Sequence, residues 1–331
     1  MRCAVVGAGA WGTALADLLA CGGHGVHIWA LEPDIADAIN SRRENPVFLP
    51  GFSLARSIVA TTDHAEALDG AELVVYATPS QHLRGVVRAG TRYLMKSTAL
   101  AVASKGIEQK TLSLMSDVVA DEAKGHPVVA ISGPSFAAEV AARQPTAIVA
   151  ASLDAEAARL TQDALSSATF RVYTHDDLVG VELGGSLKNV MAVATGIAEG
   201  VGLGNNSRAA LITRGLAEMT RLGVALGARA STFAGLAGIG DLVLTCTGAL
   251  SRNRAVGVEI GKGKTLDEAL AGKPTVAEGV TTTTSAVALA QREDVEMPIA
   301  TTVYRILFEG HTAKRAIAEL MARGLRAEQD A

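Results

Sequence analysis

The sequence predicts an α/β protein in which a doubly wound domain with a parallel sheet precedes an all-α C-terminal domain. Three observations support this prediction. Short apolar runs alternate with helix-like segments through the first half, the second half has helical periodicity alone, and the length of 331 residues is about twice that of a usual domain. We therefore expect two domains, which comprise residues 1–178 and 179–331.

The expected strands are short apolar runs without polar alternation, which is typical of strands buried on both faces of a parallel sheet. They comprise residues 3–6, 26–30, 58–61, 73–77, 100–104, 128–132 and 147–151. The helix-like segments between them comprise residues 11–21, 34–41, 65–68 and 112–120. The pattern changes between residues 174 and 178, and helices are then expected over 179–199, 208–226, 265–270, 281–291, 299–308 and 312–323.

The composition excludes several classes of protein. Hydrophobic residues make up 49% of the chain and charged residues 19%, which excludes intrinsic disorder. Thirty Lys and Arg residues against 34 Asp and Glu residues give a net charge of −4, so the chain lacks the positive field of a nucleic-acid binder. We expect a small-molecule partner and no nucleic acid. The sequence leaves the oligomeric state open, with a homodimer among the alternatives.

The cysteines and the apolar segments bear on the cellular setting. Cys3, Cys21 and Cys246 are odd in number and have no spacing typical of metal ligands, so we expect no metal site and a reducing compartment. The longest apolar stretch, 223–250, contains charged residues and glycines, so no membrane span is expected. The apolar start of the chain predicts a first strand rather than a signal peptide. We expect a soluble, cytoplasmic protein.

A glycine-rich motif follows the first expected strand and opens the first expected helix. Gly7, Gly9 and Gly12 fit the pattern G-x-G-x-x-G, in which the first glycine permits a tight turn, the second lets the backbone approach a pyrophosphate, and the third allows close helix–strand packing. The alternative is a glycine-rich turn without a ligand. The strand–turn–helix context favours a Rossmann-type dinucleotide site.

The choice between NAD and NADP is normally made at the end of the second strand. Glu32 lies twenty residues after Gly12, where a carboxylate can accept hydrogen bonds from the ribose hydroxyls of NAD. The alternative is a solvated loop charge, and Arg42 and Arg43 could still reach the extra phosphate of NADP. We expect NAD or NADP as the cofactor, with a modest preference for NAD.

Polar residues follow later strands at the edge where open α/β sheets bind ligands. Lys105 follows the expected strand 100–104 and could supply a positive charge to a substrate oxygen, although an ordinary surface lysine is the alternative. The strand 128–132 is followed by Gly133, Ser135 and Ala137, in a turn with exposed N–H groups and a hydroxyl.

An unusual lysine lies in the first long helix of the second half. Gly184 and Gly185 each cost about 1 kcal/mol in a helix interior relative to Ala, which predicts close approach of a cofactor or another backbone. Lys188 and Asn189 follow within the same apolar helix. Desolvation lowers the pKa of a lysine toward the range useful for proton transfer. The alternative is a lysine whose ammonium reaches the surface.

An acid and a group of phosphate donors follow. Asp241 emerges from an apolar, glycine-rich stretch and needs a partner if buried, for which Lys188 is the candidate. Ser251, Arg252 and Asn253 offer donors suited to a phosphate, and a plain basic loop is the alternative.

Taken in order, these residues resemble the bacterial-type NAD(P)-dependent sn-glycerol-3-phosphate dehydrogenases. The resemblance spans nearly the whole chain, in the blocks 7–16, 79–81, 104–108, 133–137, 187–190, 240–242, 251–253 and 276–279. It implies a Rossmann domain, a helical domain and an active site between them. It also implies hydride transfer between NAD(P) and sn-glycerol 3-phosphate or dihydroxyacetone phosphate. This reaction would supply glycerol phosphate, a phosphate ester, for phospholipid synthesis.

The resemblance also implies roles for individual residues. Lys188 becomes the proton acceptor. The substrate is expected near Lys105, Gly133, Ser135, Lys188, Asn189, Asp241, Ser251, Arg252 and Asn253. The dinucleotide is expected near Ala10, Trp11, Lys105, Ala137, Arg252, Val276 and Glu278. Many members that use NADP have a basic residue where this chain has Leu31 and Glu32, which puts the usual NADP preference in doubt.

Two other functions remain open on the sequence. A related 3-hydroxy-acid or 6-phosphogluconate dehydrogenase would share the two-domain plan, but the lysine expected three residues before an asparagine is missing. A dinucleotide sensor without turnover would keep the glycine-rich loop. It would not need Lys188, Asp241 and Arg252 together, so their joint presence favours an enzyme.

Overall fold

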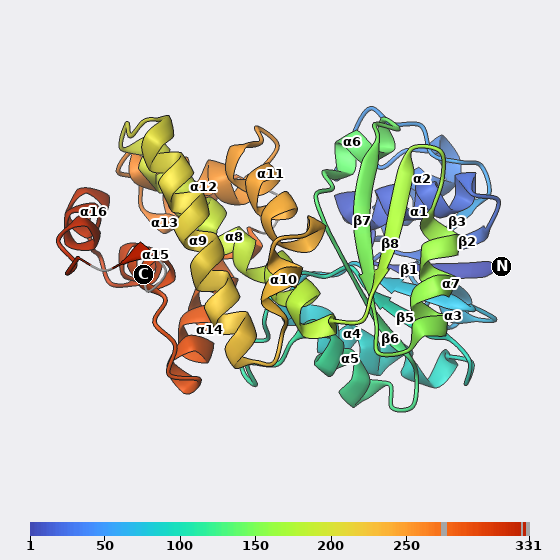
Figure 1. The fold of residues 1–331 in the computed structure, drawn as a ribbon. Coiled ribbons are helices and arrows are strands. Elements are labelled where there is room, and N and C mark those ends of the chain that lie inside the picture. Colours follow the sequence, from blue (N-terminus) through green and yellow to red (C-terminus); the bar gives the residue numbers. More distant parts are fainter. Residues whose placement is uncertain (273–276, 326, 329–331) are drawn as a thin grey trace. The chain divides into compact units, whose positions relative to one another are not determined.

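The computed structural model describes residues 1–272, 277–325 and 327–328 and divides into two compact units (Figure 1). The sheet unit comprises Met1–Lys105 and Ser113–Leu178, and the helical unit comprises Gly106–Leu112 and Val179–Ala331. The short segment Gly106–Leu112 therefore packs with the helical unit although it lies within the range 1–178. Its backbone is held there by two hydroxyl groups, because Gly106 N–H donates to Ser186 Oγ at 2.9 Å and Ser285 Oγ donates to the Ile107 carbonyl at 3.1 Å.

The sheet unit contains one eight-stranded sheet in the order β3-β2-β1-β4-β5-β6-β7-β8. The strands are β1 (Arg2–Val6), β2 (Gly25–Trp29), β3 (Ile58–Thr61), β4 (Leu73–Tyr76), β5 (Ala99–Val102), β6 (Val128–Ser132), β7 (Thr146–Ala151) and β8 (Phe170–His175). The helices are α1 (Ala10–Cys21), α2 (Pro33–Arg42), α3 (His64–Leu68), α4 (Leu83–Gly90), α5 (Met115–Glu122), α6 (Ala137–Ala141) and α7 (Ala155–Leu165), with short 3-10 turns at Ser80–His82 and Thr91–Tyr93.

The central strands of the sheet are buried on both faces, which confirms the doubly wound α/β prediction. Alternate residues of β1 enter different cores: Val5 packs with Leu15 and Leu19 of α1, whereas Val6 packs with Leu83 of α4 on the other face. Both faces of the central strands are therefore apolar, which is why these strands appear as unbroken apolar runs in the sequence.

Two features at one end of the sheet differ from the expected parallel arrangement. Strand β7 runs antiparallel to β6, and β8 then pairs with β7 in parallel. The strand β8 was not predicted because it lies at the sheet edge and alternates, with Phe170 and Val172 buried and Arg171 and Tyr173 exposed. Residues of this kind do not form a continuous apolar run.

Every regular element in the described residues of the second domain is a helix, as predicted. Its helices are α8 (Leu178–Gly200), α9 (Asn205–Ala225), α10 (Ala230–Phe233), η3 (Leu236–Gly240), α11 (Asp241–Thr247), α12 (Arg252–Gly261), α13 (Leu266–Leu270), α14 (Glu278–Arg292), α15 (Pro298–Phe308) and α16 (Ala313–Met321). The helices between residues 230 and 261 were not predicted, because short glycine-rich helices have no sustained period. Among the described residues, no helix combines the length and apolar character needed to cross a bilayer.

Candidate active site

The glycine-rich loop connects β1 to α1, and two of its glycines are required by the protein's own backbone. Gly7 has φ +116°, and a Cβ there would lie 2.9 Å from the Ala77 carbonyl oxygen. A Cβ on Gly12 would collide with the carbonyl oxygen of Gly7. Gly9 differs, because a Cβ there would have no neighbour within 4 Å. The backbone beside Gly9 is therefore open to a ligand.

The start of α1 suits an anion. Gly9 is the N-cap residue, and no side chain caps the helix there. The half-buried Ala10 and Trp11 form its first turn. Because the first N–H groups of a helix lack partners within the helix and carry a partial positive charge, they bind phosphate readily. The open space at Gly9 and this helix start together fit the pyrophosphate of a dinucleotide.

Three charged residues that follow β2 in the chain are Glu32, Arg42 and Arg43. Glu32 is exposed and forms the N-cap of α2. Arg42 lies 3.6 Å from Glu44, from Nε to Oε1, and Arg43 donates to the Ile58 carbonyl at 2.9 Å. Both arginines thus have partners within the protein, while the carboxylate at Glu32 faces solvent.

Three residues expected to bind substrate meet at one carbonyl group in the sheet unit. Lys105 Nζ lies 3.4 Å from the Gly133 carbonyl oxygen, and Ser135 Oγ donates to the same oxygen at 3.0 Å. Gly133 has φ +143°, and a Cβ there would lie 2.8 Å from Ile148 Cα, so only glycine fits. Ala137 begins α6 directly after this turn. The turn therefore gathers an ammonium and a hydroxyl at one end of β6.

The helical unit contains a buried lysine–carboxylate pair. Lys188 of α8 and Asp241 of α11 form an ion pair, and they are 7% and 1% exposed. The Lys188 ammonium also donates to Thr245 Oγ1 at 2.9 Å, and Thr245 in turn donates to the Asp241 carbonyl at 2.6 Å. The expected partnership of Lys188 and Asp241 is confirmed. Since Thr245 is four residues beyond Asp241, both face the lysine from the same side of α11.

The electrostatics of this cluster favour a charged lysine. A neighbouring carboxylate stabilises the ammonium form, which opposes the effect of burial considered from the sequence alone. Cys246 lies close by, and burial raises the pKa of its thiol to about 12. The thiol therefore stays neutral at physiological pH.

Asn189 and Asn253 join the start of α12 to α8. Asn253 Nδ2 donates to Asn189 Oδ1 at 2.9 Å, and Asn253 Oδ1 accepts from Gly279 N–H at 2.9 Å. Ser251 is the N-cap of α12 and accepts from Arg254 N–H at 3.3 Å. The two carboxamides thus fix the N-terminus of α12 beside the residue that follows Lys188.

Arg252 is the first residue of α12, and its side chain is exposed. Packing around the guanidinium nevertheless removes water from it and lowers its pKa, while the half-buried carboxylate of Glu278 acts in the opposite direction. Arg252 and Glu278 are therefore electrostatic neighbours, and the guanidinium stays charged at neutral pH.

Glycines set the spacing between these helices. A Cβ on Gly196 would collide with the Arg254 carbonyl, and one on Gly257 would collide with the Val193 carbonyl. Gly184 approaches the Ala237 carbonyl in the same way, as its position in the helix predicted. The backbones of α8 and α12 are therefore in contact, which brings the start of α12 toward the helix that carries Lys188.

Sequence reasoning missed some members of the site. Thr245 and Gly279 were not selected, although the four-residue spacing from Asp241 to Thr245 could have indicated the first of them. Gly279 lies in the block 276–279 of the family resemblance, but no local signal predicts that its N–H donates to Asn253. Val276 lies outside the described residues.

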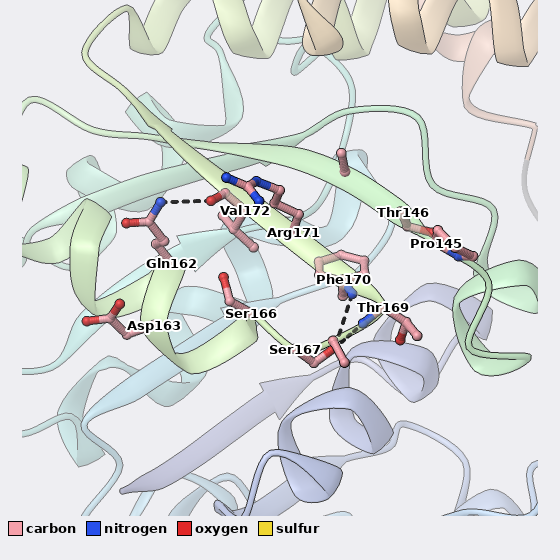
Figure 2. A pocket seen from close by; sticks show the side chains of 12 residues that line it. Pro145, Thr146, Gln162, Asp163, Ser166, Ser167, Thr169, Phe170, Arg171 and Val172 are labelled. Atoms are coloured by element: carbon pink, nitrogen blue, oxygen red, sulfur yellow. Dashed lines mark hydrogen bonds between the residues drawn. The ribbon is translucent and has the colours of Figure 1, made fainter.

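A separate hollow of about 600 Å³ lies beside β7, α7 and β8 (Figure 2). Among its lining residues, Gln162 Nε2 donates to the Val172 carbonyl at 2.7 Å, and Ser167 Oγ accepts from Phe170 N–H at 3.1 Å. None of the residues predicted to bind substrate or cofactor lines this hollow.

A dinucleotide loop on a doubly wound sheet, combined with a buried lysine on a helical unit, defines a nicotinamide-dependent dehydrogenase. Family models described as the N-terminus and C-terminus of NAD-dependent glycerol-3-phosphate dehydrogenase match residues 2–158 and 177–318. The chain belongs to the NAD-dependent glycerol-3-phosphate dehydrogenase family.

Individual relatives agree over the full length. A glycerol-3-phosphate dehydrogenase [NAD(P)+] of Citrifermentans bemidjiense is 52% identical over 330 residues, which are 99% of this chain and 98% of that protein. One of Nitratidesulfovibrio vulgaris is 48% identical and covers 99% of this chain and 100% of its own length. The crystal structure of glycerol-3-phosphate dehydrogenase from Coxiella burnetii has a TM-score of 0.94 at 41% identity, covering 97% of this chain and 99% of that one. These similarities support the dehydrogenase and neither of the alternative functions.

Proposed function

We propose that the protein interconverts sn-glycerol 3-phosphate and dihydroxyacetone phosphate with NAD(P) and so supplies glycerol phosphate for phospholipid synthesis. The observation that carries this proposal is the buried cluster of Lys188, Asp241 and Thr245, in a chain of this family. Burial of an ammonium costs free energy of folding, and a role in the reaction explains why it is kept there.

The proposed reaction transfers a hydride and a proton. When bound, the nicotinamide would supply the hydride to C2 of dihydroxyacetone phosphate, or would accept it in the reverse direction. Lys188 handles the proton on the C2 oxygen: its ammonium donates during reduction, and the neutral amine accepts during oxidation. Asp241 and Thr245 orient the ammonium through their contacts with Nζ. Lys105 polarises the carbonyl of the substrate.

The proposed phosphate site lies at the start of α12. Ser251, Arg252 and Asn253 there combine a hydroxyl, a guanidinium and a carboxamide with the N-terminus of a ten-residue helix. A helix N-terminus and an arginine both favour a doubly charged phosphate. Asn189 contacts Asn253, so it would place the substrate hydroxyls relative to that phosphate.

The proposed dinucleotide site uses Gly7, Gly9 and Gly12, the first turn of α1 and the residues Ala137 and Glu278. We propose a preference for NAD over NADP. The exposed carboxylate of Glu32 is suited to ribose hydroxyls and repels a 2′-phosphate, whereas Arg42 and Arg43 already have partners.

An assay at 340 nm tests the reaction and the cofactor preference together. Purified enzyme is mixed with dihydroxyacetone phosphate and either NADH or NADPH, and we expect oxidation of both with a higher kcat/KM for NADH. No absorbance change with either cofactor would refute the reaction. A higher kcat/KM for NADPH would refute the role of Glu32.

The Lys188→Ala variant tests the proposed proton donor. Loss of a general acid lowers the rate by about 10²–10⁴-fold, and we expect kcat to fall by this factor. Lys262→Ala is the matched control, because Lys262 lies in the same unit with an exposed side chain that pairs with Glu259. Turnover of Lys188→Ala within a few-fold of that control would remove Lys188 from the role.

The setting of this reaction is also part of the proposal. We place the enzyme in the cytoplasm, which is supported by three free cysteines, Cys3, Cys21 and Cys246. A homodimer is the assembly state that we propose, and sedimentation equilibrium of the purified protein would distinguish it from a monomer.

A further inference from the structure

The glycine-rich loop is supported by a buried carboxamide from another part of the chain. Asn45 lies in the segment between α2 and β3, and it is 0% exposed. Its Nδ2 donates to the Ala8 carbonyl at 2.8 Å and to Thr13 Oγ1 at 2.9 Å, and its Oδ1 accepts from Phe48 N–H at 3.0 Å. A buried carboxamide needs partners of this kind, so its orientation is strongly determined.

The chemistry of the partners determines which way the carboxamide faces. The Ala8 carbonyl can only accept a hydrogen bond and the Phe48 N–H can only donate one, so the amide nitrogen must face the loop. Thr13 Oγ1 also donates to the Ala8 carbonyl at 3.3 Å. Two donors therefore hold this one carbonyl on the protein side of the loop.

The segment that carries Asn45 has a second attachment to α1. Ala55 N–H donates to Asp17 Oδ1 at 2.8 Å, and Asp17 is 3% exposed and forms an ion pair with Arg143. The segment is thus attached to the start of α1 through Asn45 and to the middle of the same helix through Ala55. Asn45 is not free to follow the loop if the loop moves.

Holding the Ala8 carbonyl also directs the N–H of the next residue. A peptide group is planar and trans, so the Gly9 N–H points opposite to the Ala8 carbonyl. The carbonyl faces Asn45, and the N–H therefore faces away from it, in a loop where the space beside Gly9 is open. A backbone N–H directed outward at the start of a helix is a donor for phosphate.

We propose that Asn45 is a positioning residue for the dinucleotide: its carboxamide orients the Ala8–Gly9 peptide so that the Gly9 N–H donates to the pyrophosphate. Asn45 itself does not touch the ligand. The inference rests on the proposed function, because it requires the glycine-rich loop to bind the dinucleotide phosphates.

The Asn45→Ala variant tests this role. We expect the Kd of NADH, or of NADPH if the wild type binds it more tightly, to rise about tenfold, the effect of losing one hydrogen bond to a charged group. The KM of dihydroxyacetone phosphate and the kcat at saturating cofactor should stay within about threefold of wild type. A merely structural role would lower the folded fraction, and hence kcat, without changing Kd. Fluorescence titration and steady-state kinetics measure these quantities.

Asn40→Ala is the matched control. Asn40 also uses both ends of its carboxamide, donating to the Ala60 carbonyl at 2.8 Å and accepting from Ala60 N–H at 2.9 Å, but its partners lie in β3. The Kd should not change in this variant. An equal Kd in Asn45→Ala and the wild type, or an equal rise in Asn40→Ala, would overturn the inference. Failure of the wild type to bind either dinucleotide would instead refute the proposed function.

If Asn45→Ala does not fold, a pair of variants at Thr13 tests whether the hydrogen bonds to the Ala8 carbonyl affect dinucleotide binding. Thr13→Ser keeps the hydroxyl that holds the Ala8 carbonyl, and Thr13→Val removes it with little change in shape. We expect the Kd to rise about threefold in Thr13→Val and to remain unchanged in Thr13→Ser. Equal values for the two variants would overturn the inference.

Discussion

Lys188 and Asp241 show how a buried charge is kept in a protein core. Each is almost fully covered, and burial of an isolated ammonium or carboxylate would cost several kcal/mol or more. Their ion pair, with Thr245 as a further partner, offsets this cost but does not make the pair a strong source of stability. The proposed proton transfer therefore explains the pair better than a contribution to folding does.

Glu218 is a second buried carboxylate, and it has a different environment. It lies in α9 and accepts backbone hydrogen bonds from Ile299 at 2.7 Å and Ala300 at 3.3 Å, at the start of α15. Burial raises its pKa from 4.5 to about 7, although these two hydrogen bonds and the charges of Arg221 and Arg323 lower it. The folded protein thus keeps a proton on Glu218 at pH values where the unfolded chain has released it.

This raised pKa predicts a pH-dependent stability. The contribution of Glu218 to the free energy of unfolding is fully present below pH 4.5 and is lost as the pH rises to about 7. In Glu218→Gln this loss should be absent, a difference of roughly 3 kcal/mol between the two pH limits. Urea denaturation of wild type and variant between pH 5 and pH 8 measures most of it.

Glu259→Gln is the control for this experiment. Lys264 and Lys262 lower the pKa of Glu259 to about 2, so it does not titrate between pH 5 and pH 8. Its substitution should leave the slope of stability against pH unchanged. Parallel curves for wild type and Glu218→Gln would contradict the raised pKa of Glu218.

At the scale of elements, the contact between α8 and α12 determines where the proposed phosphate donors lie. Gly196 and Gly200 of α8 face Gly257 and Gly261 of α12, and a Cβ on any of them would collide with a backbone carbonyl. Small residues at this spacing let two helices approach until their backbones touch. The start of α12 then lies beside the part of α8 that carries Asn189.

The Gly257→Ala variant should separate these helices. The added methyl has to displace the Val193 carbonyl, so we expect the free energy of unfolding to fall by about 1–3 kcal/mol. We also expect the KM of dihydroxyacetone phosphate to rise, because Ser251 and Asn253 move with α12. Urea denaturation and steady-state kinetics measure the two effects.

Gly85→Ala is the control for Gly257→Ala, because it adds a methyl group where there is space for it. Gly85 lies in α4, and a Cβ there has no neighbour within 4 Å. Alanine in that position should raise the stability by up to about 1 kcal/mol. If Gly257→Ala were as stable as Gly85→Ala, the contact between α8 and α12 could not be as close as the structure has it.

At the scale of the whole molecule, the chain passes between its two units more than once. The segment Gly106–Leu112 belongs to the helical unit, where Ser186 and Ser285 bind its backbone and Ile107 is 0% exposed. A cut after residue 178 would therefore leave this segment without its partners.

A fragment of residues 1–178 tests this division. We expect it to bind a hydrophobic dye and to scatter light, because Ile107 becomes exposed, and we expect Ile107→Ser to reduce both signals in the fragment. The same substitution should destabilise the full chain, where the side chain is buried. A fragment whose dye binding does not respond to Ile107→Ser would contradict the assignment of this segment to the helical unit.

Features that depend on neighbours along the chain could be predicted from the residue pattern alone. The doubly wound strands, the glycine-rich loop before α1 and the long helix with Lys188 all have local patterns, since burial on both faces and a tight turn select residue types directly. The membership of the family was also visible, because its motifs occur in order.

The pairing of Lys188 with Asp241 was predicted from the sequence, but most other contacts between distant residues required the tertiary structure. Thr245 beside Lys188, Gly279 beside Asn253 and Asn45 beneath the loop at Ala8 are selected by packing, and no local pattern encodes them. The antiparallel direction of β7 and the edge strand β8 were missed for a related reason, because strand direction and edge position depend on the path of the whole chain. The residue pattern indicates whether a side chain is buried, whereas its contacts with residues distant in the sequence depend on the fold.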